Sequence, residues 1–162
     1  MQAKAVFLDR DGVLIDNHDH YYIWKTDQMK LVDGVIENLK LISAKGYLLF
    51  IVSNQGGISK QLYTKNDSQS LHIELHETFN QQGINIEAIS FCPHHPEIEK
   101  CLCRKPDSLM IEKLLAKHKV DPVKSYFIGD SQSDMEAASN AGIRSIRIPA
   151  NQNMKPYIVQ LL

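Results

Sequence analysis

The sequence is poor in cysteine, nearly neutral in charge and free of long hydrophobic runs. Three cysteines among 162 residues are an odd number, which excludes a closed disulfide framework. A formal net charge of −1 provides no basic field for a polyphosphate backbone, so we do not expect nucleic acid as a partner. No run approaches the roughly 18 apolar residues of a membrane span, and acidic residues follow the start too soon for a signal peptide. We therefore expect a soluble cytoplasmic protein without membrane partners.

What the sequence does contain is a regular alternation of apolar patterns. Its 162 residues, 43% of them hydrophobic, suit one domain, and we expect residues 1–162 to form it as a monomer. Short apolar runs of strand composition alternate with segments of helical spacing. The expected strands are 5–8, 47–52, 86–91, 125–128 and 143–148, and the expected helices are 33–45, 67–82, 107–119 and the segment around 135–141 that ends before Gly142.

This alternation predicts an α/β fold with three layers, in which a parallel central sheet lies between helices, as in Rossmann-like proteins. Two segments do not fit it. Residues 13–32 suggest a flap or hairpin over a site, and residues 92–106 an irregular loop. The tail, residues 155–162, is expected to form a short closing helix or strand. Ligands of such sheets bind at the carboxyl ends of the strands, so the polar residues there are the candidates for function.

Two aspartates follow the first expected strand. Residues two apart in an extended segment point to the same side, so the carboxylates of Asp9 and Asp11 can converge. Two like charges that close are costly without a cation or proton between them, and a site of hard oxygen ligands suits Mg²⁺. The alternative is that Asp and Gly residues only end the strand here.

Polar residues also end the second and fourth expected strands. Ser53 and Asn54 precede two glycines that would let backbone N–H groups approach an anion, although a plain polar turn has the same composition. Asp130 would emerge at the same sheet edge as Asp9 and add a third carboxylate. Asp134, four residues later, either orients a metal ligand or only complements a helix N-terminus.

A basic pair precedes the third expected helix. Arg104 and Lys105 stand beside a helix start, where a fixed cation makes a plausible phosphate clamp, whereas a lone lysine is more often solvated surface.

All three cysteines fall within twelve positions of one loop. Together with a histidine they form the pattern C-x-H-x6-C-x-C, with Cys92, His94, Cys101 and Cys103 as the closed tetrahedral set of a structural Zn²⁺ site. His95 is an alternative to His94 as ligand. Ordinary buried thiols would not explain the concentration in a polar loop. Metal binding there would order the loop that leads into Arg104 and Lys105.

The order of these motifs along the chain resembles that of the haloacid dehalogenase superfamily of aspartate-based phosphatases. The resemblance rests on DRDG at 9–12, SN at 53–54, a lysine before a helix and GDxxxD at 129–134, and it covers roughly residues 4–148. It implies the superfamily's fold without a large cap domain, so that loops select the substrate. The segments DRDGVLID, VDGVIENL, SNQGGIS, CPHHP and CRKP resemble the small capless group that includes heptose-bisphosphate and histidinol-phosphate phosphatases.

The resemblance implies a role for each matching residue. Asp9 would be the nucleophile that forms an aspartyl-phosphate, and Asp11 the general acid and base. Asp9, the backbone carbonyl of Asp11 and Asp130 would hold Mg²⁺. The phosphate oxygens would be held by Ser53, Asn54 and Lys105.

The resemblance leaves two substrates open. Hydrolysis of the 7-phosphate of D-glycero-D-manno-heptose 1,7-bisphosphate, a step toward lipopolysaccharide or other surface polysaccharide precursors, needs a distal cation, for which Arg104 and Lys60 are candidates. Histidinol phosphate is itself cationic and would need acidic residues such as Asp16 or Asp19. The short metal loop is closer to the histidinol-phosphate type, and Ser131 stands where relatives often have a basic residue. A zinc-stabilised module that only binds phosphorylated ligands is the non-enzymatic alternative.

The nucleophile assignment can be tested directly. We expect Asp9→Asn to abolish phosphate release in the presence of Mg²⁺ because an amide does not attack phosphorus, while the fold remains intact. Phosphate assays and circular dichroism would measure the two effects. Substantial residual activity in a folded variant would remove Asp9 as the nucleophile.

Overall fold

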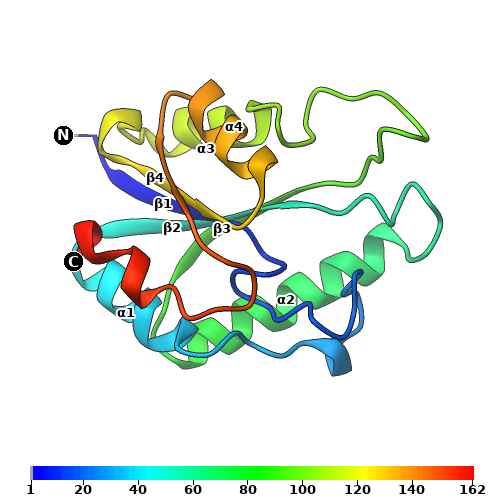
Figure 1. The fold of residues 1–162 in the computed structure, drawn as a ribbon, viewed down its shortest axis with the longest axis horizontal. Coiled ribbons are helices and arrows are strands. Elements are labelled where there is room, and N and C mark those ends of the chain that lie inside the picture. The colour runs from blue at the N-terminus through cyan, green and yellow to red at the C-terminus, as the bar shows by residue number, and fades with distance from the viewer. Residues whose placement is uncertain (1) are drawn as a thin grey trace.

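The computed structural model, which describes residues 2–162, contains a five-stranded parallel sheet (Figure 1). Its strand order is β3-β2-β1-β4-β5, and neighbouring strands all run parallel. The strands are β1 (Lys4–Leu8), β2 (Tyr47–Asn54), β3 (Ile86–Cys92), β4 (Tyr126–Gly129) and β5 (Arg144–Arg147). The helices between them are α1 (Val35–Ala44), α2 (Lys65–Gln81), α3 (Leu109–His118) and α4 (Gln132–Asn140). The predicted alternation and the α/β class are confirmed.

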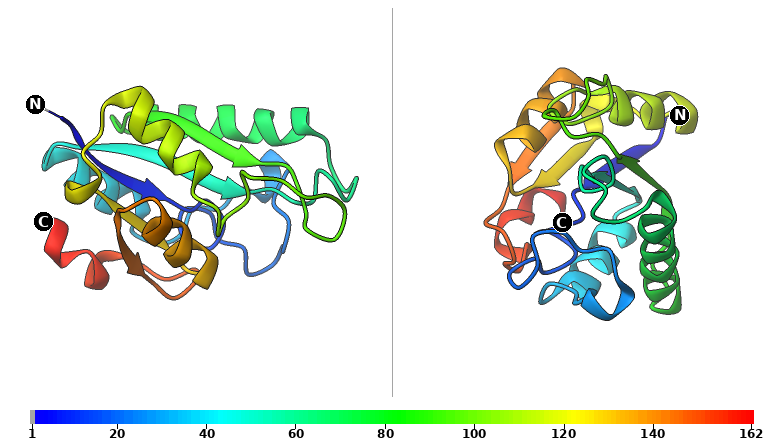
Figure 2. Two further views of the ribbon diagram at one scale, coloured as in Figure 1. Left: turned by 90° about the horizontal axis from the view of Figure 1, so that it is seen from above. Right: turned by 90° about the vertical axis from the view of Figure 1, so that its right-hand side faces the viewer.

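The helices cover the two faces of the sheet in pairs (Figure 2). Side chains alternate along β1, so that Val6 and Leu8 pack with α1 and α2, whereas Ala5 and Phe7 pack with α3 and α4. Each helix contributes one apolar stripe to this contact, for example Leu71, Leu75 and Phe79 from α2. Burial of both faces explains why the central strands are apolar without strict alternation.

The strand order places the polar strand ends together. From β1 the chain first moves to β2 on one side and later returns to β4 on the other, which creates a crevice at the carboxyl ends of these three strands. Leu8 pairs with Ile51 of β2 and with Ile128 of β4, so Asp9 follows at the centre of that edge.

The segments outside the alternation are irregular. Residues 13–32 form no regular hairpin; an isolated bridge joins Ile15 to Leu31, and a 3-10 turn covers Thr26–Gln28. A further 3-10 turn, Pro122–Lys124, precedes β4. The last residues form two more, Lys155–Tyr157 and Val159–Leu161. No inserted cap domain occurs within residues 2–162, and none of the helices in this range has the length and apolarity to cross a membrane.

The aromatic core on the α3 and α4 side gives a stability prediction. Phe50 of β2 is fully buried and stacks on Phe7, with ring centroids 5.1 Å apart. We expect Phe50→Ala to lower the free energy of unfolding by about 3–5 kcal/mol because it removes this packing and leaves a cavity. Urea denaturation would measure the change. Val123→Ala is the control, since Val123 is 65% exposed, and an equal loss in both variants would contradict the prediction.

Candidate active site

A cavity of about 290 Å³ opens at the carboxyl ends of β1, β2 and β4. Eight of the residues predicted to act on or bind phosphate or Mg²⁺ line it: Asp9, Asp11, Ser53, Asn54, Arg104, Lys105, Asp130 and Asp134. Eight others complete the wall: Asn17, Tyr21, Tyr22, Gln55, Gly56, His95, Ser131 and Ser133. Three of these, Asn17, Tyr21 and Tyr22, belong to the segment that was expected to form a flap. Strand ends and loops distant in sequence thus share one site.

A buried lysine joins two of the carboxylates. The Lys105 side chain is 3% exposed, and its Nζ lies 2.9 Å from Asp9 Oδ1 and 2.6 Å from Asp134 Oδ1. Nζ also donates to the carbonyl oxygen of Val52, at 2.9 Å. Buried charges require such partners because desolvation of an unpaired ion is very costly. Lys105 is therefore a fixed positive charge between two carboxylates rather than a solvated surface lysine.

Burial controls the ionisation of this cluster. It raises the pKa of Asp9 to about 8, although Lys105 acts in the opposite direction and Asp134 adds to the rise. Burial alone would lower the pKa of Lys105, but Asp9 and Asp134 hold it above its ordinary value. Burial opposes the ionisation of Asp134, yet Lys105 and Ser131 bring its pKa below the usual range. Asp134 is thus ionised beside Lys105, whereas burial and the negative charge of Asp134 disfavour ionisation of Asp9.

Asp134 lies at the helix start, one of the two positions that the sequence left open for it, and it also contacts Lys105. It is fully buried in the first turn of α4, where Ser131 caps the helix and exchanges hydrogen bonds with the Asp134 backbone and carboxylate. Its carboxylate also packs directly against Gly129, where any side-chain carbon would collide with it. The cap and the glycine together aim Asp134 at Lys105.

Three carboxylates form a possible cation site. One oxygen from each of Asp9, Asp130 and Asp134 lies within 4.8 Å of the others. Hard oxygen donors of this kind suit Mg²⁺. Burial and Asp134 raise the pKa of Asp130, which is the expected effect of crowding like charges.

The carboxylate of Asp11 lies outside this group, so the two side chains do not converge on one cation as the DRDG spacing suggested. Arg10 holds it through two hydrogen bonds, from Nε to Oδ1 at 2.8 Å and from Nη2 to Oδ2 at 2.9 Å. Gln55 donates a third, to Oδ2 at 3.1 Å. The local reason is that β1 ends at Leu8 and the chain then turns, with the N–H groups of Leu14 and Ile15 donating to the Arg10 carbonyl, so the alternation of an extended chain no longer applies.

Asn54 lines the cavity and also contacts the backbone of Lys105. Its side-chain amide donates to the carbonyl oxygen of Lys105 and accepts from the Lys105 N–H, both at 3.0 Å. Asn54 therefore fixes the backbone that carries the buried lysine. Ser53 is buried beside it, and its Oγ accepts a 2.7 Å hydrogen bond from Gln55 Nε2.

Gln55 and Tyr63 were not singled out from the sequence. The Tyr63 hydroxyl donates to Gln55 Oε1 at 2.6 Å, which orients the Gln55 amide toward Ser53 and Asp11. Burial raises the pKa of Tyr63, so its hydroxyl remains a donor. The SNQGG segment contained the only available signal, a polar residue directly after Ser53 and Asn54; Tyr63 had none.

Arg10 was also missed, although it lies between the two aspartates. It is fully buried; Nη1 lies 3.0 Å from His72 Nε2, and Nη2 donates to the Ile23 carbonyl at 2.6 Å. Burial and the Arg10 charge lower the pKa of His72 to about 3, so the imidazole is neutral at physiological pH.

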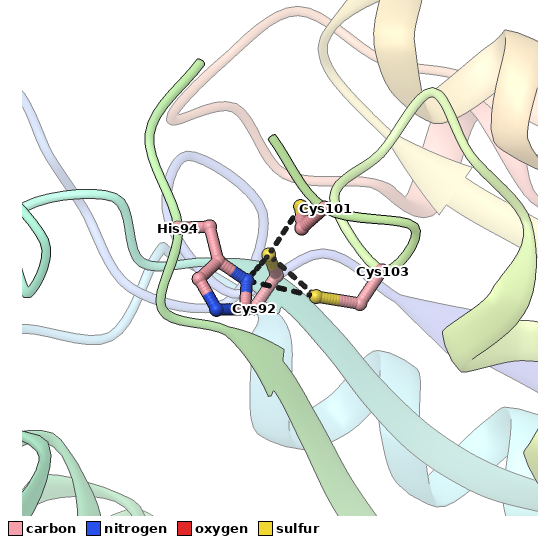
Figure 3. A group of neighbouring side chains, drawn as sticks. All are labelled: Cys92, His94, Cys101 and Cys103. Carbon is pink, nitrogen blue, oxygen red and sulfur yellow. Dashed lines mark hydrogen bonds between the residues drawn. The ribbon is translucent and has the colours of Figure 1, made fainter. Parts of the chain in front are cut away.

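The cysteine loop brings its four expected ligands together (Figure 3). Cys92 Sγ lies 2.9 Å from Cys103 Sγ, 3.6 Å from Cys101 Sγ and 3.4 Å from His94 Nδ1. A tetrahedron with metal–sulfur bonds of about 2.3 Å has edges of about 3.8 Å. The Cys92–Cys101 separation is close to this value and the Cys92–Cys103 separation is shorter, and all four ligand atoms lie within 4.8 Å of one another. His95 points elsewhere, with Nδ1 3.6 Å from Glu97.

The two cations proposed for a distal phosphate are placed differently. Arg104 lines the cavity, and its Nη1 donates to the His94 carbonyl at 2.9 Å, which ties it to the cysteine loop. Lys60 is not part of the cavity wall; its Nζ pairs with Glu97 at 3.3 Å. The candidate acidic residues for a cationic substrate, Asp16 and Asp19, are likewise outside the wall.

Comparisons with known proteins agree with this geometry. The family model described as haloacid dehalogenase-like hydrolase matches residues 8–148. The chain is 38% identical over 151 residues to the D-glycero-beta-D-manno-heptose-1,7-bisphosphate 7-phosphatase of Haemophilus ducreyi, which covers 90% of this chain and 82% of the relative. It is 40% identical over 155 residues to the D-glycero-alpha-D-manno-heptose-1,7-bisphosphate 7-phosphatase of Campylobacter jejuni, with 96% and 87% covered.

A solved structure is similar as well. The D,D-heptose 1,7-bisphosphate phosphatase of B. bronchiseptica, complexed with magnesium and phosphate, superposes with a TM-score of 0.83 at 27% sequence identity. The superposition covers 97% of this chain and 86% of that one.

The neutral His72 gives a pH-dependent stability prediction. Its pKa is about 3 in the folded protein and about 6.5 in the unfolded chain, so only the unfolded chain binds a proton between these values. The stability that the neutral His72 contributes is fully present above about pH 6.5. As the pH falls below that value, the free energy of unfolding decreases by about 1.4 kcal/mol per pH unit. Between pH 6 and pH 4, the free energy of unfolding measured with urea should fall less in His72→Gln than in the wild type. An equal fall in both proteins would contradict the assigned pKa.

Proposed function

This chain is a phosphatase of the haloacid dehalogenase-like hydrolase family, and we propose that it removes the 7-phosphate of D-glycero-D-manno-heptose 1,7-bisphosphate. The observation that carries the proposal is that the buried Asp9–Lys105–Asp134 cluster and Arg104 line the same cavity. A phosphate at Asp9 and a second phosphate at Arg104 would both face a fixed cation.

The reaction proceeds in two displacements at phosphorus, with Asp9 as the attacking group in the first and the leaving group in the second. Its carboxylate attacks phosphorus, the bond to the sugar oxygen breaks, and Asp11 gives that oxygen a proton. Asp11 then takes a proton from water as the water attacks the aspartyl-phosphate, which releases phosphate and restores both carboxyl groups. Lys105 stabilises negative charge at Asp9 and on the phosphate oxygens during both steps.

We assign Mg²⁺ to the carboxylate group. Asp9 and Asp130 would hold it together with the Asp11 carbonyl, and Asp134 contributes negative charge beside them. The three side chains fit this ion because all offer hard oxygen donors within 4.8 Å of one another. When bound, Mg²⁺ reduces the repulsion between the carboxylate of Asp9 and the phosphate.

We assign Zn²⁺ to the cysteine loop. Three thiols and one imidazole match its preferred structural ligands and leave no open position for substrate. The loop runs into Arg104, whose guanidinium also binds the His94 carbonyl. The metal would therefore hold the distal cation in place without taking part in the chemistry.

The cavity wall favours a bisphosphate over histidinol phosphate. Arg104 and His95 lie on the wall, whereas Asp16 pairs with Lys30 and Asp19 is exposed beside His18. A cationic substrate would find no acidic residue there beyond those of the carboxylate cluster and Asp11.

A substrate panel tests the proposed activity. We expect both anomers of heptose 1,7-bisphosphate to have higher kcat/KM than histidinol phosphate or simple sugar monophosphates. Arg104→Met should raise the KM for the bisphosphate about 10–100-fold, because it removes a charged hydrogen bond. Lys60→Met, a cation of the same region outside the wall, should leave it unchanged. A preference for histidinol phosphate, or equal effects of the two variants, would overturn the assignment.

Removal of zinc gives a separate prediction. Metal analysis should find one zinc per chain, and chelation should raise the KM for the bisphosphate several-fold while kcat with saturating substrate changes less, because the loop positions Arg104. Circular dichroism would check that the core remains folded. An unaltered KM in verified zinc-free protein would show that the loop does not position Arg104.

A further inference from the structure

We propose that Arg10 and His72 are positioning residues that hold Asp11 in place for proton transfer, an inference that rests on the proposed phosphatase mechanism. Arg10 does not line the cavity, so it acts on a substrate only through Asp11. Its two parallel hydrogen bonds to the carboxylate fix both the position and the rotation of that group. The guanidinium itself takes part in no step of the proposed mechanism.

The guanidinium is held from several directions. Nε binds Asp11, Nη2 binds Asp11 and the Ile23 carbonyl, and Nη1 meets His72. Arginine has no acceptor atom, so the contact requires His72 Nε2 to be the unprotonated acceptor. The low pKa of His72 agrees with that state. His72 is in turn packed against Phe91, with ring centroids 5.0 Å apart.

These contacts assign proton transfer to one oxygen of Asp11. A carboxylate has about four lone-pair positions. Oδ2 accepts from Arg10 and from Gln55, which uses both of its positions, whereas Oδ1 accepts only from Arg10 Nε. Oδ1 therefore keeps one lone pair for the proton that Asp11 gives and takes. Loss of the two parallel hydrogen bonds from Arg10 would free the carboxylate to rotate, so that Oδ1 and Oδ2 would no longer differ in their hydrogen bonds.

Substitution of His72 can disturb the contact between Arg10 and Asp11 without changing a residue of the cavity wall. It lies on α2, 62 positions from Arg10, and borders a surface groove of about 460 Å³. His76 lies one turn further along α2 in the same groove and is exposed, so it serves as a matched control. His72→Leu removes the acceptor for Nη1, His72→Gln retains one, and Arg10→Lys keeps the charge but loses the fork.

The experiment compares two leaving groups under single-turnover conditions. A sugar alkoxide needs a proton from Asp11 to leave, whereas p-nitrophenolate does not. For Arg10→Lys and His72→Leu we expect the rate of aspartyl-phosphate formation from a sugar phosphate to fall about 100-fold. The rate from p-nitrophenyl phosphate should stay near that of the wild type. The concentration of sugar phosphate that gives half of the maximal rate should change little. The rates of His72→Gln and His76→Leu should match those of the wild type.

Other outcomes overturn the inference. Equal losses with both substrates would mean that Arg10 and His72 only support the fold, and so would a His72→Gln variant as slow as His72→Leu. Unchanged rates would remove them from the mechanism. If the wild type hydrolyses p-nitrophenyl phosphate and another sugar phosphate but not the heptose bisphosphate, the proposed substrate is wrong and the comparison still decides the role of Arg10. A wild type without phosphatase activity would overturn both proposals.

Discussion

The contact on which the rest of the site depends is the buried ammonium of Lys105 between Asp9 and Asp134. A charge that is 3% exposed persists only when its partners are held rigidly. The neighbouring structure supplies this rigidity: Asn54 binds the Lys105 backbone, and Gly129 leaves room for the Asp134 carboxylate. The position of Asp9, the proposed nucleophile, follows from these constraints.

The two aspartates of the DRDG segment differ because each has its own cation. Asp9 faces Lys105 inside a crowded carboxylate cluster, whereas Asp11 faces Arg10 and the amide of Gln55. In the proposed mechanism the two neighbouring carboxyl groups therefore have separate roles, Asp9 as the nucleophile and Asp11 as the proton carrier. Each cation comes with its own support, Asn54 for Lys105 and His72 for Arg10.

The sequence predicted the architecture well because the relevant information is local. Apolar periodicity marked all five strands and four helices, and parallel strands necessarily bring their carboxyl ends to one edge. That rule alone brought Asp9, Ser53 and Asp130 to one cavity. It could not show that Asp11 turns toward Arg10, that Asn54 holds the backbone of Lys105, or that Lys60 pairs with Glu97, because each depends on which partner a side chain meets after folding.

The cysteine loop and the contacts of Arg10 and Lys105 differ in how far apart their residues lie in the sequence. Four possible ligands within twelve positions of one loop are close in space because they are close in sequence. The sequence by itself therefore determined this cysteine cluster, together with the class of fold. His72 is 62 positions from Arg10, and Lys105 is 96 positions from Asp9. Only the tertiary structure decided these pairs, because a buried charge takes its partner from whatever the packed elements place within hydrogen-bond distance.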